Sequence, residues 1–239
     1  MRGLTAWTAG LAGERDAAQP LLTLYDGPAR VELSGATTAN WVAKSANLLV
    51  DGLGAPQRVG LLLPLHWQTV ALLLAGVATG ATVVVAGEPA DLAGCDVAFV
   101  SGDAAQAALE VGVDEVLALS GHPLGAPLPQ VPAMVSDYAR EVPSYGDHWG
   151  GAIPQGWTVE VGGSPVGPLP ALDVGPEDRV LVAVDPADPA GLAGLLAVLT
   201  AGAALVLAPD VGGLNLASVT SGERLTASLG IHVPGLRRL

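Results

Sequence analysis

The chain has 239 residues, half of them hydrophobic and 14% charged, which fits a folded globule and excludes a disordered chain. Its formal net charge of -13 would repel a phosphate backbone, so we expect no nucleic-acid partner. The single cysteine, Cys95, excludes an internal disulfide and a cysteine-rich metal site.

Cys95 precedes a short apolar run, so it is interpreted as a buried structural thiol. A single cysteine without a disulfide partner fits a reducing compartment. Together with the lack of a signal-peptide pattern at the N-terminus, it indicates a cytoplasmic protein.

The first predicted elements are a β-hairpin and a helix. Leucine and valine alternate with other residues around the turn Asp26–Pro28, at Leu22, Leu24, Val31 and Leu33. The helix is predicted to begin at a cap on Thr37 or Thr38 and to end at Gly54. Its core positions, at helical spacing, are Trp41, Val42, Ala46, Leu49 and Leu53.

Two segments of the chain can be aligned so that Arg58 meets Arg179 and, after one inserted residue, Gly80 meets Gly202. Each has an apolar run, a proline-containing loop, an Ala/Leu helix ended by glycine, and a second apolar run. This pattern predicts a βαβ unit that occurs twice. The uncharged stretch Val70–Gly87 lies in the first unit, and its glycines indicate helix, turn and strand rather than a membrane span.

The apolar runs show no alternation, which is typical of parallel strands covered by helices on both faces. Further strands are predicted at Val97–Val100 and Val116–Leu119, joined by a helix over Asp103–Val111 with Asp103 as its cap. We therefore predict an α/β fold with two repeated, βαβ-containing, mainly parallel doubly wound layers.

The chain is predicted to divide into a first αβα subdomain with the hairpin and helix, residues 1–144, and a smaller βαβ subdomain, residues 145–239. The proline- and glycine-rich stretch 122–175 is predicted to link the two repeats and to contain a strand at Trp157–Val161.

Ligands of open parallel sheets bind beyond the carboxyl ends of the strands. The repeats place His66, Trp67, Asp185 and Asp188 at such ends, and these four are our candidate ligand-binding residues. The alternative is that they begin helices, with Trp67 as a packing residue and the aspartates as caps. The four histidines are scattered, so no metal site is predicted, and no catalytic residue is assigned.

The stretch VELSGATTANWVAKSANLLVDGLGAPQRVGLLLPLHWQTVALLLAGVATGATVVVAG resembles the opening of adenylate-forming (AMP-binding) enzymes, such as acyl-CoA synthetases and amino-acid-activating domains. The stretch DRVLVAVDPADPAGLAGLLAVLTAGAALVLAPD resembles their later strand-helix-strand. The resemblance implies the fold of the two N-terminal subdomains of those enzymes. The chain is also similar to a short uncharacterised family of such relatives.

The resemblance also implies a phosphate-binding Ser-Gly-Thr-Thr-Gly run between the repeats, and this run is missing. The nearest candidate, Gly162–Gly167, has neither threonine nor lysine, and the only lysine, Lys44, lies on the first helix. The family places a catalytic lysine near its C-terminus, without a counterpart here. We therefore expect no adenylation activity and no cofactor, since ATP, AMP or CoA is not supported by motifs.

Three hypotheses follow. The first is a non-catalytic relative that binds a small ligand or a protein partner and forms a homodimer through apolar surface. The second is an enzyme acting on acyl or nucleotide substrates, with Asp185, Asp188 or His66 as acid-base groups. The third is a subunit completed in trans by a second chain.

Overall fold

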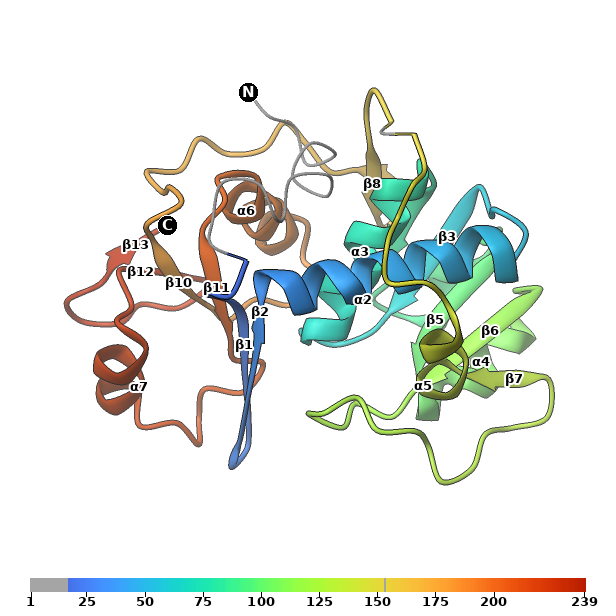
Figure 1. Ribbon diagram of the computed structural model, residues 1–239, viewed down its shortest axis with the longest axis horizontal. Coiled ribbons are helices and arrows are strands. Elements are labelled where there is room, and N and C mark those ends of the chain that lie inside the picture. The colour runs from blue at the N-terminus through green and yellow to red at the C-terminus, as the bar shows by residue number, and fades with distance from the viewer. Residues whose placement is uncertain (1–16, 153) are drawn as a thin grey trace.

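The computed structural model describes residues 17–152 and 154–239, which form two β-sheets with helices between and outside them (Figure 1). Within these residues sheet 1 has the strand order β7-β6-β5-β3-β4-β8-β9, and sheet 2 has the order β13-β12-β10-β11-β1-β2. The strands of sheet 1 are β3 (Arg58–Leu62), β4 (Thr82–Val85), β5 (Val97–Ser101), β6 (Glu115–Leu119), β7 (Val135–Asp137), β8 (Thr158–Val161) and β9 (Ser164–Pro165). The strands of sheet 2 are β1 (Pro20–Asp26), β2 (Ala29–Ser34), β10 (Arg179–Val182), β11 (Ala204–Leu207), β12 (Ala227–Leu229) and β13 (Arg237–Arg238). The helices are α2 (Gly35–Asn47), α3 (Trp67–Thr79), α4 (Ala105–Glu110), α5 (Tyr138–Glu141), α6 (Pro189–Thr200) and α7 (Leu216–Glu223).

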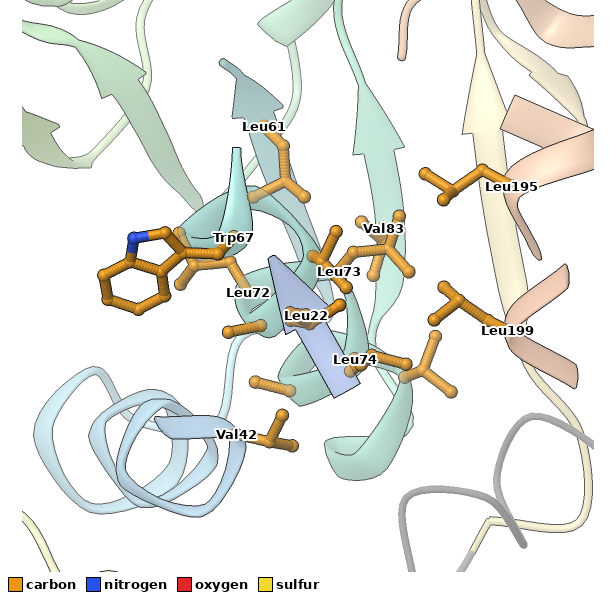
Figure 2. Close-up of a cluster of buried hydrophobic side chains, with 14 of the residues drawn as sticks. Leu22, Val42, Leu61, Trp67, Leu72, Leu73, Leu74, Val83, Leu195 and Leu199 are labelled. Carbon is orange, nitrogen blue, oxygen red and sulfur yellow. The ribbon is translucent and has the colours of Figure 1, made fainter. Parts of the chain in front are cut away.

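Both sheets are covered on both faces, as the continuous apolar runs predict. The largest hydrophobic cluster lies between the sheets and includes side chains of α2, α3 and α6. There Leu195 and Leu199 of α6 face Leu74 of α3 and Val83 of β4 (Figure 2). A second cluster joins the outer face of sheet 1 to α4, and a third joins the outer face of sheet 2 to α7. The predicted α/β class is confirmed, with five alternating layers.

The internal repeat extends over six strands of each sheet. The run β6-β5-β3-β4-β8-β9 corresponds in order and strand direction to β13-β12-β10-β11-β1-β2. The terminal hairpins are exchanged along the chain. The hairpin β1-β2 precedes the first βαβ unit but joins sheet 2, whereas β8-β9 precedes the second unit but joins sheet 1.

The two arginines matched by the sequence alignment make corresponding contacts. Arg58 donates across β4 to Glu160 of β8 at 2.9 Å, and Arg179 donates across β11 to Thr23 of β1 at 2.7 Å. Glu160 and Thr23 occupy corresponding register positions in their sheets. The repeat therefore holds at the level of side-chain contacts as well as topology.

The division into residues 1–144 and 145–239 does not coincide with sheet membership. The hairpin assigned to the first part pairs with β11, and β8 of the second part pairs with β4. The division remains a prediction about folding units, which sheet membership does not test.

Two predicted caps are wrong. The N-cap of α2 is Ser34, whose side chain accepts a hydrogen bond from the backbone N–H of Thr37 at 3.2 Å, so the helix begins directly at the end of the hairpin. Asp103 is not the cap of α4, because it lies inside a 3-10 turn, Gly102–Ala104, that precedes that helix.

Other local predictions are confirmed. The glycines at the ends of the two crossover helices, Gly80 and Gly202, have positive φ angles of 82° and 78°. Cys95 is buried, and burial raises the pKa of its thiol. Among the described residues, no helix combines the length and apolarity that crossing a bilayer requires.

Candidate functional site

The candidate residues His66 and Trp67 lie at the switch point of sheet 1. The chain leaves β3 through α3 toward β4, and it leaves the neighbouring strand β5 through α4 toward β6 on the other side. Because α3 and α4 lie on opposite faces of the sheet, the ends of β3 and β5 flank the place where ligands bind in such sheets.

His66 is the N-cap of α3, and its side chain is buried. Its Nδ1 accepts a hydrogen bond from the backbone N–H of Gln68 at 3.2 Å. Burial, with a smaller contribution from nearby His122, lowers the pKa of His66 to about 4. The ring is therefore neutral near pH 7, and because Nδ1 accepts, its proton is on Nε2. This Nε2 is buried without a hydrogen-bond partner among the described residues.

Trp67 belongs to the core of the protein. Its side chain is buried, and its ring centroid lies 5.0 Å from that of Trp41 on α2. The indole Nε1 donates to the carbonyl oxygen of Pro123 at 2.8 Å. Trp67 thus joins α2 and α3 to the segment after β6.

That segment, residues 120–134, lies over the switch point, and we call it the covering loop. Gly125 of the loop has a φ of 67°, and a Cβ added there would lie 2.8 Å from Nε2 of Gln68 and 2.9 Å from Cζ2 of Trp67. A Cβ added to Gly102, which follows β5, would likewise lie 2.9 Å from Cδ2 of Leu128 in the loop. The loop exposes three large hydrophobic side chains, Leu124, Val131 and Met134.

The other candidate pair, Asp185 and Asp188, lies at the end of β10 in sheet 2. Oδ2 of Asp188 accepts a hydrogen bond from the backbone N–H of Gly191 at 2.7 Å, and Oδ1 of Asp185 accepts one from Ala187 at 2.9 Å. Both carboxylates therefore shape the entry to α6 as turn and cap residues.

At the equivalent switch point of sheet 2, the segments that follow β10 and β12 pack closely against each other. A Cβ added to Gly230, which follows β12 with a φ of 81°, would lie 2.2 Å from the carbonyl oxygen of Ala183. The loops after β4 and β10 touch at Gly87 and Ala187. Among the described residues, however, no hydrogen bond or ion pair joins the His66 and Trp67 pair to the two aspartates.

The segment whose sequence is most similar to a phosphate-binding loop, Gly162–Gly167, begins with a tight hairpin turn. Val161 pairs with Ser164, which leaves Gly162 and Gly163 as a two-residue turn with φ angles of 55° and 74°. Lys44 makes its hydrogen bonds elsewhere. Its Nζ donates to the carbonyl oxygens of Pro143 and Tyr145.

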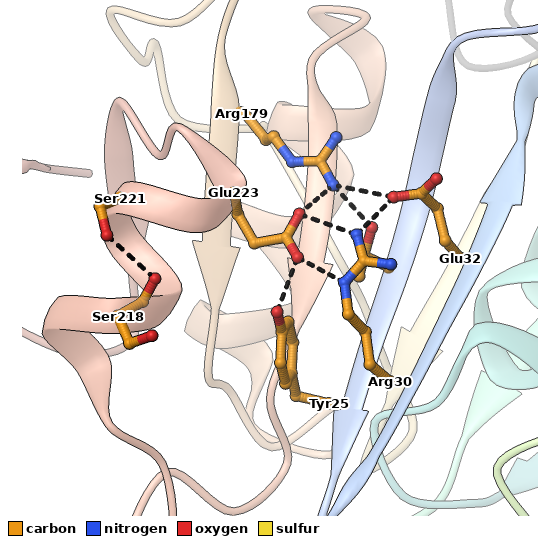
Figure 3. A network of polar contacts seen from close by, with 8 residues as sticks. Tyr25, Arg30, Glu32, Arg179, Ser218, Ser221 and Glu223 are labelled. Carbon is orange, nitrogen blue, oxygen red and sulfur yellow. Dashed lines mark hydrogen bonds and ion pairs between the residues drawn. The ribbon is translucent and has the colours of Figure 1, made fainter.

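Sequence reasoning did not identify a polar cluster around Glu223, at the end of α7 (Figure 3). Glu223 accepts hydrogen bonds from Tyr25 at 2.7 Å, from Arg30 at 2.6 Å and from Arg179 at 2.5 Å. Burial alone would raise the pKa of Glu223, but bonds from Arg30 and Tyr25 and the charge of Arg179 outweigh it and lower the pKa to about 2. The sequence contains one signal for this cluster, the alignment of Arg179 with Arg58 in the internal repeat.

The cluster joins the hairpin β1-β2, strand β10 and helix α7, and the carboxylate of Glu223 is occupied by protein donors. We therefore interpret it as a structural contact. Among residues 17–152 and 154–239, no group of three or more His, Cys, Asp or Glu side chains could hold a metal ion.

A scan against protein-family models gives no match. A protein of Mycobacterium tuberculosis (strain ATCC 25618 / H37Rv), described as a TIGR03089 family protein, is 39% identical to this chain over 202 residues, which are 80% of this chain and 83% of that protein.

Solved structures with the same fold are adenylate-forming enzymes. An acyl-CoA synthetase of Brucella canis matches with a TM-score of 0.75 and 19% identity, over 95% of this chain and 47% of the synthetase. The anthranilate CoA ligase AuaEII, in complex with anthranoyl-AMP, matches with a TM-score of 0.73 and 17% identity, over 95% of this chain and 49% of the ligase. The N-terminal domain of FACL13 from Mycobacterium tuberculosis has a TM-score of 0.69 and 16% identity, over 96% of this chain and 63% of that domain. The chain thus has the fold of the N-terminal part of such enzymes and spans about half the length of the synthetase.

Proposed function

This chain belongs to the TIGR03089 family, and from that premise we propose that it binds a small ligand at the switch point of sheet 1 and does not form adenylates. The observation that supports the loss of adenylation is the turn at Gly162 and Gly163. By resemblance, the phosphate-binding run belongs between the two repeats, but here a two-residue hairpin turn occupies that region. A cradle for phosphates needs several backbone N–H groups directed to one point, and a turn this short does not supply them.

The candidate carboxylates support the same proposal. Asp185 and Asp188 accept hydrogen bonds from backbone N–H groups at the start of α6, and general acid-base work would compete with that role. At sheet 1, by contrast, His66 has a polar atom that no described residue satisfies. Three other buried side-chain atoms lack a partner among the described residues, but they lie at the start of β10, within α7 and within β12, on Arg179, Thr220 and Ser228. Only the atom of His66 lies beyond the carboxyl end of a strand, which favours sheet 1 over sheet 2 as the place where a ligand binds.

A thermal-shift screen with ATP, AMP, CoA and acyl-CoA thioesters tests ligand binding. A ligand at a hundred times its Kd stabilises the folded state by about 2.7 kcal/mol and raises the Tm by roughly 5–10 °C. The parallel assay measures pyrophosphate release from ATP, magnesium and a set of carboxylic acids, and we expect none above the blank. Release that survives Lys44→Ala but is lost in Asp188→Ala would instead support an enzyme with a non-standard site.

We further propose that the protein is a cytoplasmic homodimer. The covering loop exposes the apolar side chains of Leu124 and Met134, with exposed fractions of 69% and 86%. Exposed apolar surface is commonly buried by self-association. Light scattering should give twice the monomer mass at micromolar concentration, and a clean monomer there would contradict the proposal.

A further inference from the structure

Among the described residues, His66 is the only buried histidine, with an exposed fraction of 6%, whereas His122, His148 and His232 are exposed. Its position at the start of a helix accounts for one ring nitrogen only. Nδ1 accepts the backbone N–H of Gln68, and this is the capping bond. Nothing in the local structure requires the second nitrogen, and a serine or asparagine would cap as well.

The capping bond determines what Nε2 can do. A neutral imidazole has one acceptor and one donor nitrogen, so a ring that accepts at Nδ1 donates at Nε2. A buried donor without a partner costs about 1–3 kcal/mol, and such a cost usually indicates a partner that the protein does not itself provide. The expected partner is therefore a hydrogen-bond acceptor.

The surroundings favour an uncharged acceptor. The ring of His66 lies 5.4 Å from that of Trp67, which in turn packs on Trp41. Burial is the main cause that lowers the pKa of His66, and among the described residues no arginine or lysine makes a hydrogen bond or ion pair with His66 or Trp67. A carboxylate or phosphate buried there would lack a cationic partner, whereas a carbonyl oxygen needs only the one donor.

The covering loop provides the route of entry. The stretch Pro123–Gly125 of the loop is hydrogen-bonded to α3 through Trp67, whose Nε1 donates to the carbonyl oxygen of Pro123. Gly125 lies against Gln68 and Trp67 without a side chain of its own. Displacement of this short stretch would uncover the parts of Trp67 and Gln68 that it contacts, and the ring of Trp67 lies next to that of His66.

We propose that Nε2 of His66 donates a hydrogen bond to the carbonyl oxygen of a small, uncharged, mainly apolar amide or ketone that binds beneath the covering loop. This proposal rests on the proposed ligand-binding function and specifies its site and ligand chemistry. The apolar part of such a ligand packs on the indole of Trp67.

The experiment uses the full chain and three probes: benzamide, benzoate and inorganic phosphate. NMR of the protein labelled with ¹⁵N-histidine follows Nε2–H of His66 during each titration. We expect benzamide to shift this resonance saturably, with an affinity at least about tenfold above that of benzoate, and phosphate to leave it unchanged.

The matched variants are His66→Ser and His232→Ser. Serine preserves the helix cap but removes the ring donor, so we expect His66→Ser to keep the fold and lose benzamide affinity by about tenfold or more. His232 is exposed and lies outside the covering loop, so His232→Ser should bind benzamide as the wild type does. If His66→Ser is poorly folded, the wild-type titration alone decides.

Two results would overturn the proposal. If no probe moves the Nε2–H resonance at millimolar concentration, the donor is satisfied by an internal water only. If benzoate or phosphate binds more tightly than benzamide, the site is an anion site. Stabilisation by a nucleotide or thioester without any effect of benzamide would refute this inference while leaving the proposed function intact, and absence of stabilisation by every ligand would refute both.

Discussion

At the residue scale, the neutral state of His66 links the stability of the protein to pH. Burial lowers its pKa from 6.5 to about 4 in the folded state, so the unfolded chain binds a proton first as pH falls. The stabilising contribution is complete above pH 6.5 and is lost between pH 6.5 and pH 4. We expect the free energy of unfolding to fall by about 3 kcal/mol across this window.

Urea unfolding at half-unit pH steps measures this dependence. The His66→Ser variant should lack this part of the fall, whereas His232→Ser, at an exposed histidine away from His66, should retain it. If the difference in the free energy of unfolding between the wild type and His66→Ser stays constant from pH 6.5 to pH 4, His66 is not buried as a neutral ring.

The carboxylate of Glu223 gives a second prediction at the same scale. Glu223→Gln leaves the guanidinium groups of Arg30 and Arg179 beside a neutral amide, and we expect a loss of about 3 kcal/mol. The folded pKa of about 2 lies below the ordinary 4.5, so this contribution is present above pH 4.5 and is lost as pH falls toward 2.

The control for Glu223 is Glu160→Gln, at the corresponding ion pair of sheet 1. The side chains of Glu160 and its partner Arg58 are 16% and 39% exposed, against 5% and 17% for Glu223 and Arg179, so we expect a loss below about 1 kcal/mol. Equal losses in the two variants, measured by urea unfolding at pH 7, would contradict the difference in burial on which the prediction depends.

Capping residues show what sequence patterns predict at this scale and what they do not. A run such as Ser34 to Thr38 offers several good caps, and only the end of the preceding strand decides that Ser34 is used. The cap formed by His66 was not predicted, since histidine is not among the preferred caps. His66 was a candidate only because of its place after a strand, and the free Nε2 depends on burial that the sequence does not display.

At the scale of elements, glycines set how closely helices approach the sheets. A Cβ added to Gly76 of α3 would lie 2.5 Å from Cγ2 of Val83 on β4. Gly76→Ala therefore forces α3 away from sheet 1, at a cost of roughly 1–3 kcal/mol that exceeds the gain of about 1 kcal/mol in helix propensity. We expect net destabilisation, measured as a lower urea midpoint.

The matched control is Gly222→Ala in α7, where an added Cβ meets no atom within 4 Å. Only helix propensity then changes, and we expect stabilisation of up to about 1 kcal/mol. Shifts of the same sign in both variants would contradict the close contact between α3 and β4.

Most helices and strands were predictable because they depend on local patterns, such as the apolar runs of β3 and β10 and the glycines that end α3 and α6. The pairing of the strands into sheets could not be predicted in the same way. Alternation of Leu22 and Leu24 predicts a hairpin but contains no information on which sheet the hairpin joins. Its partner, β11, lies far along the chain, and the pairing depends on the whole repeat.

At the scale of the whole molecule, the exchanged hairpins connect the two sheets into one unit. Each sheet takes its βαβ strands from one part of the chain and its hairpin from the other. The central hydrophobic cluster also draws on both sheets and on α3 and α6. We therefore expect a single calorimetric transition for the full chain, with equal van't Hoff and calorimetric enthalpies.

The exchange also predicts how fragments behave. Residues 1–144 contain the βαβ unit of sheet 1 but lack its hairpin β8-β9, and residues 145–239 lack the hairpin β1-β2 of sheet 2. Each fragment alone exposes its own part of the central cluster, so neither should show a cooperative urea transition. A mixture of the two should regain the near-UV circular dichroism of the intact chain, because the two sheets and the cluster between them re-form only together. A sigmoidal transition for residues 1–144 alone would instead identify that part as an independent folding unit.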